Sequence, residues 1–163
     1  MKGEIYNFIL HSDIGTGTTV ASKTFFIDWN RIPNSRYKLT FSFTSSSLAI
    51  ATAFDAILYI NELGCSNNTT CMGQYGSTSL NSGFIGILRN YTIATYLETN
   101  ITDNPPSYLH SRPRDNQIIV NIRQNLASQI TAYTPLPTRY TLILSFEQLD
   151  DDIELIFRNY FII

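Results

Sequence analysis

The chain has 163 residues, of which 44% are hydrophobic and only 15% are charged, and its formal net charge is −2. Its 11 Lys and Arg are scattered singly, which argues against direct binding to nucleic acid, because phosphate binding needs clustered positive charge. The opening MKGEIYNFILHS lacks the pattern of a signal peptide, and no apolar run approaches the roughly 18 residues of a membrane span. We therefore expect one domain over 1–163, no membrane insertion and synthesis in a reducing compartment.

Period-2 alternation of apolar and polar residues is the strongest pattern, and it is typical of strands with one buried face. In chain order it predicts strands at 4–11, 24–29, 37–44, 53–61, 84–90, 93–98, 117–123 and 139–147, followed by an added segment at 153–163. The Ala-rich stretch 48–58 is ambiguous, since it also allows a helical turn. Eight short antiparallel strands with uneven loops favour an all-β single jelly roll, a two-sheet antiparallel sandwich. The core roll is expected over 4–149, with a C-terminal extension over 150–163.

The same alternation predicts which side chains share the core. These are Tyr37, Leu39, Phe41, Phe43, Ile118, Val120, Ile122, Tyr140, Leu142, Leu144 and Phe146. A helix would scatter each set around its axis. Because Phe and Leu side chains fill large volumes, their removal from such a core is strongly destabilising.

Residues with catalytic potential are few and poorly grouped. His11, Ser12 and Asp13 suggest a hydrolytic triad, but neighbours on a strand point to opposite faces, so a strand end is the favoured interpretation. Cys65 and Cys71 have C-x5-C spacing with no third ligand nearby, so we expect two thiols in a long polar loop and no metal site. A disulfide between them stays an open alternative.

Three further polar stretches favour structural interpretations. Residues 150–152 are three aspartates without the alternation or glycine of a calcium loop, and Gly15–Gly17 lacks the lysine and helix of a phosphate loop. In the segment 103–116, Arg112 and Arg114 suggest a carboxylate clamp. The favoured interpretation is a proline-stiffened loop whose arginines bind backbone carbonyls or a nearby acid. We therefore expect no catalytic residue, no cofactor and no enzyme.

Four stretches carry a resemblance to a known family. FFIDWNRIP at 25–33, YKLTFSFTSS at 37–46, DNPP…RPRDNQIIVNI at 103–122 and YTLILSFEQL at 140–149 resemble, in this order and spacing, single-jelly-roll minor capsid proteins of nucleocytoplasmic large double-stranded DNA viruses. The resemblance covers roughly residues 4–149 and implies an architectural role in the virion. Such proteins cement capsomers or form pentons, with the major capsid protein and other minor capsid proteins as partners. The alternative is a jelly-roll ligand- or glycan-binding module, for which Tyr75, Tyr108 and Tyr133 are candidates.

The C-terminal segment 153–163 is apolar on both faces when read as a strand, which indicates that it is covered. One arrangement pairs it with its own domain beside the N-terminal strand, and the other adds it to a neighbouring subunit, including by self-association. We favour the second, because the core roll is complete by residue 147. The candidate partner-contact residues are Ile153, Leu155, Phe157, Tyr160, Phe161 and Ile163.

Overall fold

The fold was examined in a computed structural model, which describes residues 3–46, 55–63, 83–89, 97–99, 104–126, 129–132 and 138–149. Within these ranges the secondary structure is all β apart from two 3-10 turns, η1 (Trp29–Arg31) and η2 (Asn61–Leu63). The strands are β1 (Ile5–His11), β2 (Thr16–Thr19), β3 (Ser22–Phe26), β4 (Tyr37–Ser45), β5 (Ala56–Tyr59), β6 (Phe84–Arg89), β7 (Glu98–Thr99), β8 (Ser107–Leu109), β9 (Gln117–Leu126), β10 (Gln129–Ala132) and β11 (Tyr140–Gln148).

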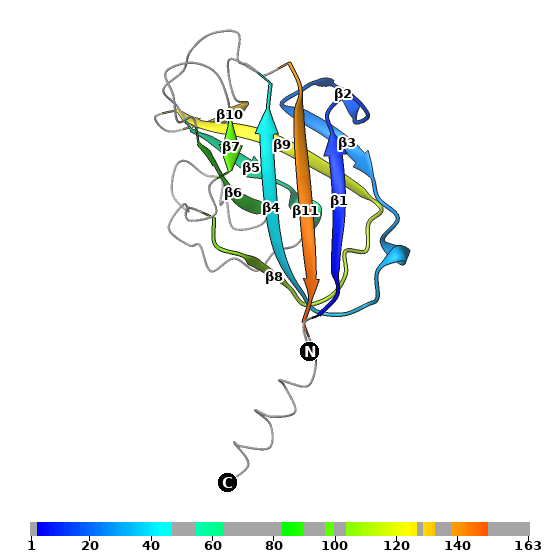
Figure 1. Cartoon of the computed structure of the whole chain (residues 1–163). Helices are drawn as coiled ribbons and strands as arrows, with labels where there is room; N and C mark the ends of the chain where they lie inside the picture. Colours follow the sequence, from blue (N-terminus) through cyan, green and yellow to red (C-terminus); the bar gives the residue numbers. More distant parts are fainter. Residues whose placement is uncertain are drawn as a thin grey trace.

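The strand pairs follow the jelly-roll order. One set runs β1-β11-β4-β8, and the other runs β3-β9-β5-β6, with every pair antiparallel. Counting only these eight strands in chain order, the first pairs with the last and the second with the seventh, which is the double Greek key of a jelly roll. The short β7 pairs with both β4 and β6, so the sets join into one curled 11-stranded sheet. The predicted fold class is confirmed, and Figure 1 shows β4, β11 and β1 side by side in front of β9 and β3.

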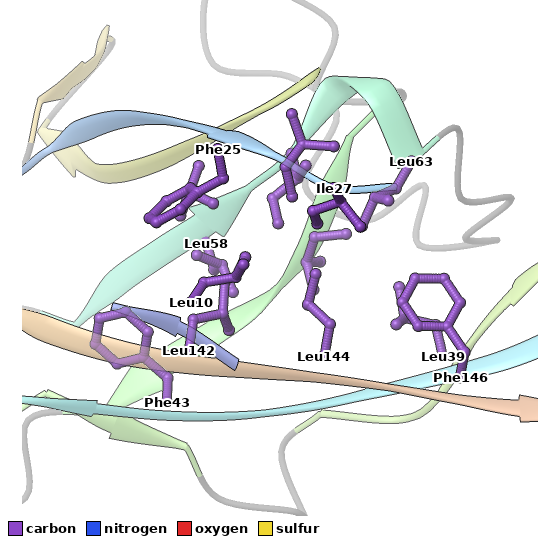
Figure 2. Close-up of a cluster of buried hydrophobic side chains, with 14 of the residues drawn as sticks. Leu10, Phe25, Ile27, Leu39, Phe43, Leu58, Leu63, Leu142, Leu144 and Phe146 are labelled. Atoms are coloured by element: carbon purple, nitrogen blue, oxygen red, sulfur yellow. The ribbon is translucent and has the colours of Figure 1, made fainter. Parts of the chain in front are cut away.

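The core lies between the two strand sets and contains the predicted side chains. Ten of the eleven predicted core residues are buried, and Phe41 is only partly buried against the core. Cross-strand register explains the agreement, since Leu39 lies opposite Phe146 and Phe43 lies opposite Leu142 on β4 and β11. Figure 2 shows these side chains facing Phe25, Ile27 and Leu58 of the second set.

An aromatic cluster closes one end of this core. The ring of Phe146 lies 5.5 Å from Phe8, 5.4 Å from Trp29 and 5.8 Å from Tyr37, measured between ring centroids. Edge-to-face and tilted contacts of this kind add stability beyond the burial of apolar area. Strands β1, β4 and β11 and the turn η1 are therefore fastened together at Phe146.

The strand predicted over 24–29 ends earlier than expected. β3 stops at Phe26, and Trp29 begins the 3-10 turn η1, where the Asp28 carboxylate accepts a hydrogen bond from the amide of Asn30 at 3.2 Å. Trp29 is nevertheless buried, and its indole Nε1 donates to the carbonyl of Asp115 at 2.7 Å. The turn, and not a longer strand, brings the indole into the core.

Two polar stretches that lie outside the predicted strands contain strands. Residues 107–109 form β8, which pairs with β4 over Tyr37–Leu39, and Ser107 and Leu109 are buried while Tyr108 is exposed. Three residues following two prolines are too short for periodicity to detect. Gly17 lies within β2 at a positive φ of 126°, a conformation that glycine adopts without strain. Of the strand predicted over 93–98, only 97–98 lie within the described residues, where Glu98 opens β7.

A tyrosine pair offers a matched test of buried hydroxyl groups. The Tyr140 hydroxyl is buried and, in the described part of the chain, has no hydrogen-bond partner, whereas the Tyr37 hydroxyl donates to the carbonyl of Pro33 at 2.6 Å. We expect Tyr140→Phe to raise the free energy of unfolding by about 1 kcal/mol, since the unsatisfied hydroxyl is removed and the stack on Phe43 is kept. Tyr37→Phe, the control, should lower it by a similar amount. Urea unfolding of both variants measures the difference.

The pH dependence of stability provides a second test of the buried Tyr140 hydroxyl. Burial raises the pKa of its hydroxyl above the ordinary value of 10.0, so at high pH the unfolded chain ionises this group before the folded chain does. The part of the free energy of unfolding that depends on this hydroxyl staying protonated is fully present below pH 10.0 and is lost as the pH rises further. The advantage of Tyr140→Phe should therefore widen above that pH, and an advantage that shrinks there would contradict the assignment.

Candidate interaction surface

The residues suggested for hydrolysis serve structural roles. Ser12 is buried, and its hydroxyl accepts a hydrogen bond from the amide of Tyr140 at 2.9 Å, while its own amide donates to the Tyr140 carbonyl at 3.0 Å. His11 and Asp13 are exposed, and the His11 Nδ1 lies 2.9 Å from the Thr141 hydroxyl. Ser12 thus fastens the end of β1 to β11, as the strand-end interpretation predicted.

We expect the two histidines to be dispensable. Both His11 and His110 are exposed, so replacing them together with alanine should change the free energy of unfolding by no more than about 0.5 kcal/mol and leave particle assembly intact. Thermal unfolding and a particle-incorporation assay check this. A hydrolytic activity that the double variant loses would reveal a site built on these side chains.

Arg112 binds backbone carbonyls, which was the favoured interpretation. Its Nη1 donates to the carbonyls of Ile32 at 3.1 Å and Trp29 at 3.4 Å, so the guanidinium holds the end of the η1 turn. A polar hollow of about 260 Å³ lies beside it, lined in part by Asn34 and the exposed Arg114. Because Arg112 is committed to the backbone, the hollow does not present a paired carboxylate clamp.

Several sequence-predicted residues lie outside the described part of the chain. These are Cys65, Cys71, Tyr75, Tyr133, the aspartates at 150–152, and the contact candidates Ile153, Leu155, Phe157, Tyr160, Phe161 and Ile163. Among the candidate tyrosines, Tyr108 is described, with 46% of its surface exposed. Within the described residues no group of three or more His, Cys, Asp or Glu is placed to hold a metal ion, and no helix is long and apolar enough to cross a membrane.

The outer edge of β1 is a free strand edge in the described structure. β1 stands at the end of the strand order and pairs with β11 alone. The amide of Gln148 donates to the carbonyl of Glu4 and the amide of Ser12 donates to Tyr140, so the even-numbered residues of this stretch bond to β11. In an antiparallel pair the alternate residues direct both backbone groups the other way. The backbone N–H and C=O groups of Ile5, Asn7 and Ile9 therefore point outward.

A groove of about 500 Å³ runs along this edge, between β1 on one side and β3 with the residues that follow it on the other. We call it the β1 edge groove; it is lined by Asn7–Leu10, Ile14, Thr16, Thr24–Asp28 and Arg31. Its floor includes the buried side chains of Leu10, Phe25 and Ile27, and its rim carries exposed apolar ones. The exposed fractions are 56% for Ile9, 70% for Ile14 and 74% for Phe26, with Ile5 at 58% farther along the same edge.

The sequence alone did not predict this groove. Alternation over 4–11 places Tyr6, Phe8 and Leu10 on one face of the strand, which leaves the apolar residues of the other face, Ile5 and Ile9, without a role. Isoleucines on the expected solvent face of a strand indicate that this face forms a contact surface. Phe26, directly after the buried Phe25, carries the same signal.

Comparison with known proteins finds a likeness among solved structures. No family model matches the chain, and no curated protein matches it. Among solved structures, a mavirus penton protein is similar over 60% of this chain and 36% of that chain, with 13% sequence identity and a TM-score of 0.40. The chain thus spans about a third of the length of that penton protein.

Proposed function

We propose that this protein is a structural component of an icosahedral virus capsid, a minor capsid or penton-type protein that cements or positions neighbouring subunits. The observation that carries the proposal is the strand order. The segments that resemble single-jelly-roll minor capsid proteins, such as 37–46 and 140–149, become the paired strands β4 and β11 at the centre of a jelly roll. The fold and the resemblance therefore rest on the same residues.

The surface supports a role in protein contact. The outer face of β4 and β11 carries few charges, with one cross-strand ion pair in which the Lys38 Nζ lies 2.9 Å from the Glu147 carboxylate. The β1 edge groove adds exposed apolar side chains to a free strand edge. Exposed apolar surface of this kind is typical of sites that bind protein. The partners we propose are the major capsid protein and other minor capsid proteins of the same virion. We propose that the protein is made in the host cytoplasm and located in the capsid.

Particle composition tests the proposal. We expect the chain to co-sediment with density-purified particles of the virus that encodes it, in fixed ratio to the major capsid protein, after salt and nuclease washing. An epitope tag placed in the polar segment 64–82 would allow its position to be seen in a particle map. If the washed particles lack the chain while the isolated protein binds defined glycans on an array, the capsid role is wrong and the glycan-binding alternative holds.

A further inference from the structure

The β1 edge groove has the features of a site for an extended polypeptide. The outward N–H and C=O groups of Ile5, Asn7 and Ile9 form a ladder that an added strand can pair with, and such pairing supplies affinity through the main chain. At its far end the ladder is closed, because the carbonyl of His11 already accepts from the amide of Ile14 at 3.1 Å. The open stretch of the edge is therefore Ile5 to Ile9.

The groove would contact both faces of such a strand. The face turned inward meets the floor at Phe25 and Ile27, and the face turned outward meets the rim at Ile9 and Phe26. A strand with one polar face would place that face against apolar side chains. The occupant that fits is an extended segment with apolar residues on both faces and few charges.

The chain itself contains such a segment outside the described residues. The sequence 153–163 reads IELIFRNYFII, with Glu154 and Arg158 as its only charged side chains. Alternate positions from Ile153 to Ile163 are apolar except Asn159, and the intervening positions include Ile156, Tyr160 and Ile162. Its 11 residues are more than enough to pair with the open edge from Ile5 to Ile9.

If the segment paired with the β1 edge of its own domain, few residues would connect it to Leu149. The described chain ends at Leu149, whose amide donates to the carbonyl of Arg36, on the β4 side of β11. The free edge of β1 lies about two strand spacings away, roughly 10 Å. If the whole segment is bound from Ile153 onward, the chain from Leu149 to Ile153 reaches at most about 14 Å when fully extended, which leaves almost nothing for a reversal of direction.

The N-terminal residues also stand in that route. Gly3 packs so closely on β11 that a Cβ at this position would overlap the carbonyl oxygen of Gln148. A segment leaving Leu149 for the β1 edge of its own domain would have to pass around Gly3 and Glu4 within those few residues. No such limit applies to a segment that arrives from another molecule.

We propose that the β1 edge groove of one copy binds residues 153–163 of a second copy as an added β-strand. Each chain then supplies one groove and one segment, so two chains exchange segments reciprocally or several chains close into a ring. This self-association deepens the proposed capsid function but requires only the fold. It is measured on the isolated protein, so its failure is distinguishable from a failure to enter particles.

Full-length variants separate the two halves of the contact. The groove variant carries Ile9→Gln and Phe26→Gln, both at exposed positions where the fold should tolerate a polar side chain. The segment variant carries Phe157→Gln and Phe161→Gln. Tyr108→Gln is the control, because it replaces an exposed aromatic residue on β8, at the opposite side of the same strand set. Light scattering after size-exclusion chromatography gives the mass of each, and thermal unfolding verifies folding.

We expect the native chain and Tyr108→Gln to be oligomers at micromolar concentration, and the groove and segment variants to associate about 30-fold more weakly each. Mixing the groove variant with the segment variant should restore a one-to-one complex, because one partner keeps an intact groove and the other an intact segment. Amide exchange at Ile5, Asn7 and Ile9 should slow in the native oligomer. A monomeric native chain overturns the proposal; if those amides are protected in it and exposed in the segment variant, the segment docks on its own domain instead.

Discussion

Replacing Phe146 with alanine should lower the free energy of unfolding by about 3–5 kcal/mol, which is a large share of the roughly 5–15 kcal/mol that holds a domain folded. Phe146 is completely buried on β11 and contacts the rings of Phe8, Trp29 and Tyr37. Its removal leaves a cavity at the point where β1, β4 and the η1 turn meet. Urea unfolding followed by far-UV circular dichroism measures the change.

Phe41→Ala is the matched control for this variant. Phe41 lies on β4 and was predicted as an equal member of the core, but it is only partly buried. We expect a loss of about 1–2 kcal/mol, in proportion to the smaller apolar area that it removes from water. Equal losses for Phe41→Ala and Phe146→Ala would show that the core does not have the described packing.

Replacing Trp29 with alanine should lower the free energy of unfolding by about 3–5 kcal/mol as well. Trp29 is 1% exposed, and its ring lies 5.0 Å from Phe8 and 5.4 Å from Phe146, between centroids. It also ties the η1 turn to the chain before β9 through the hydrogen bond from Nε1 to the Asp115 carbonyl. Both contributions are lost in the alanine variant.

Trp29→Phe separates packing from hydrogen bonding. Phenylalanine keeps an aromatic ring beside Phe146 but leaves the Asp115 carbonyl without its donor, so we expect a smaller loss of about 1–2 kcal/mol. Trp29 is the chain's one tryptophan, so in the native protein its fluorescence also reports unfolding. A Trp29→Phe variant as unstable as Trp29→Ala would mean that the hydrogen bond, and not the packing, dominates.

The strands with clean alternation could be predicted because burial on one face of a strand is a local property. β4, β9 and β11 each carry several apolar residues at period 2, and the structure places them where they were expected. Where the alternating pattern covers only a few residues, the strand was not predicted. β8 has only three residues, and it pairs over Tyr37–Leu39 because the fold places β4 beside it.

The polar segment 103–116 shows why the sequence could not identify the particular partners of polar side chains. Asn104 pairs with a single residue of β6, accepting from the Ile87 amide at 2.6 Å and donating to its carbonyl at 2.9 Å. Arg112 likewise binds the carbonyls of Trp29 and Ile32, some 80 residues away in the chain. Both side chains bond to backbone groups that only the folded arrangement brings within reach.

The sequence alone determined the fold class, most strands and ten members of the core, because the period of the apolar residues sets which face of each strand is buried. It also predicts that the segment 153–163 is covered, which lies outside the described residues. Only the tertiary structure decided which strand edge stays open. The pairing of β1 with β11 joins residues at least 130 positions apart, and it directs the backbone groups of Ile5, Asn7 and Ile9 outward beside Phe26. Strand order is a property of long-range pairing, and no local pattern records which strand has only one neighbour.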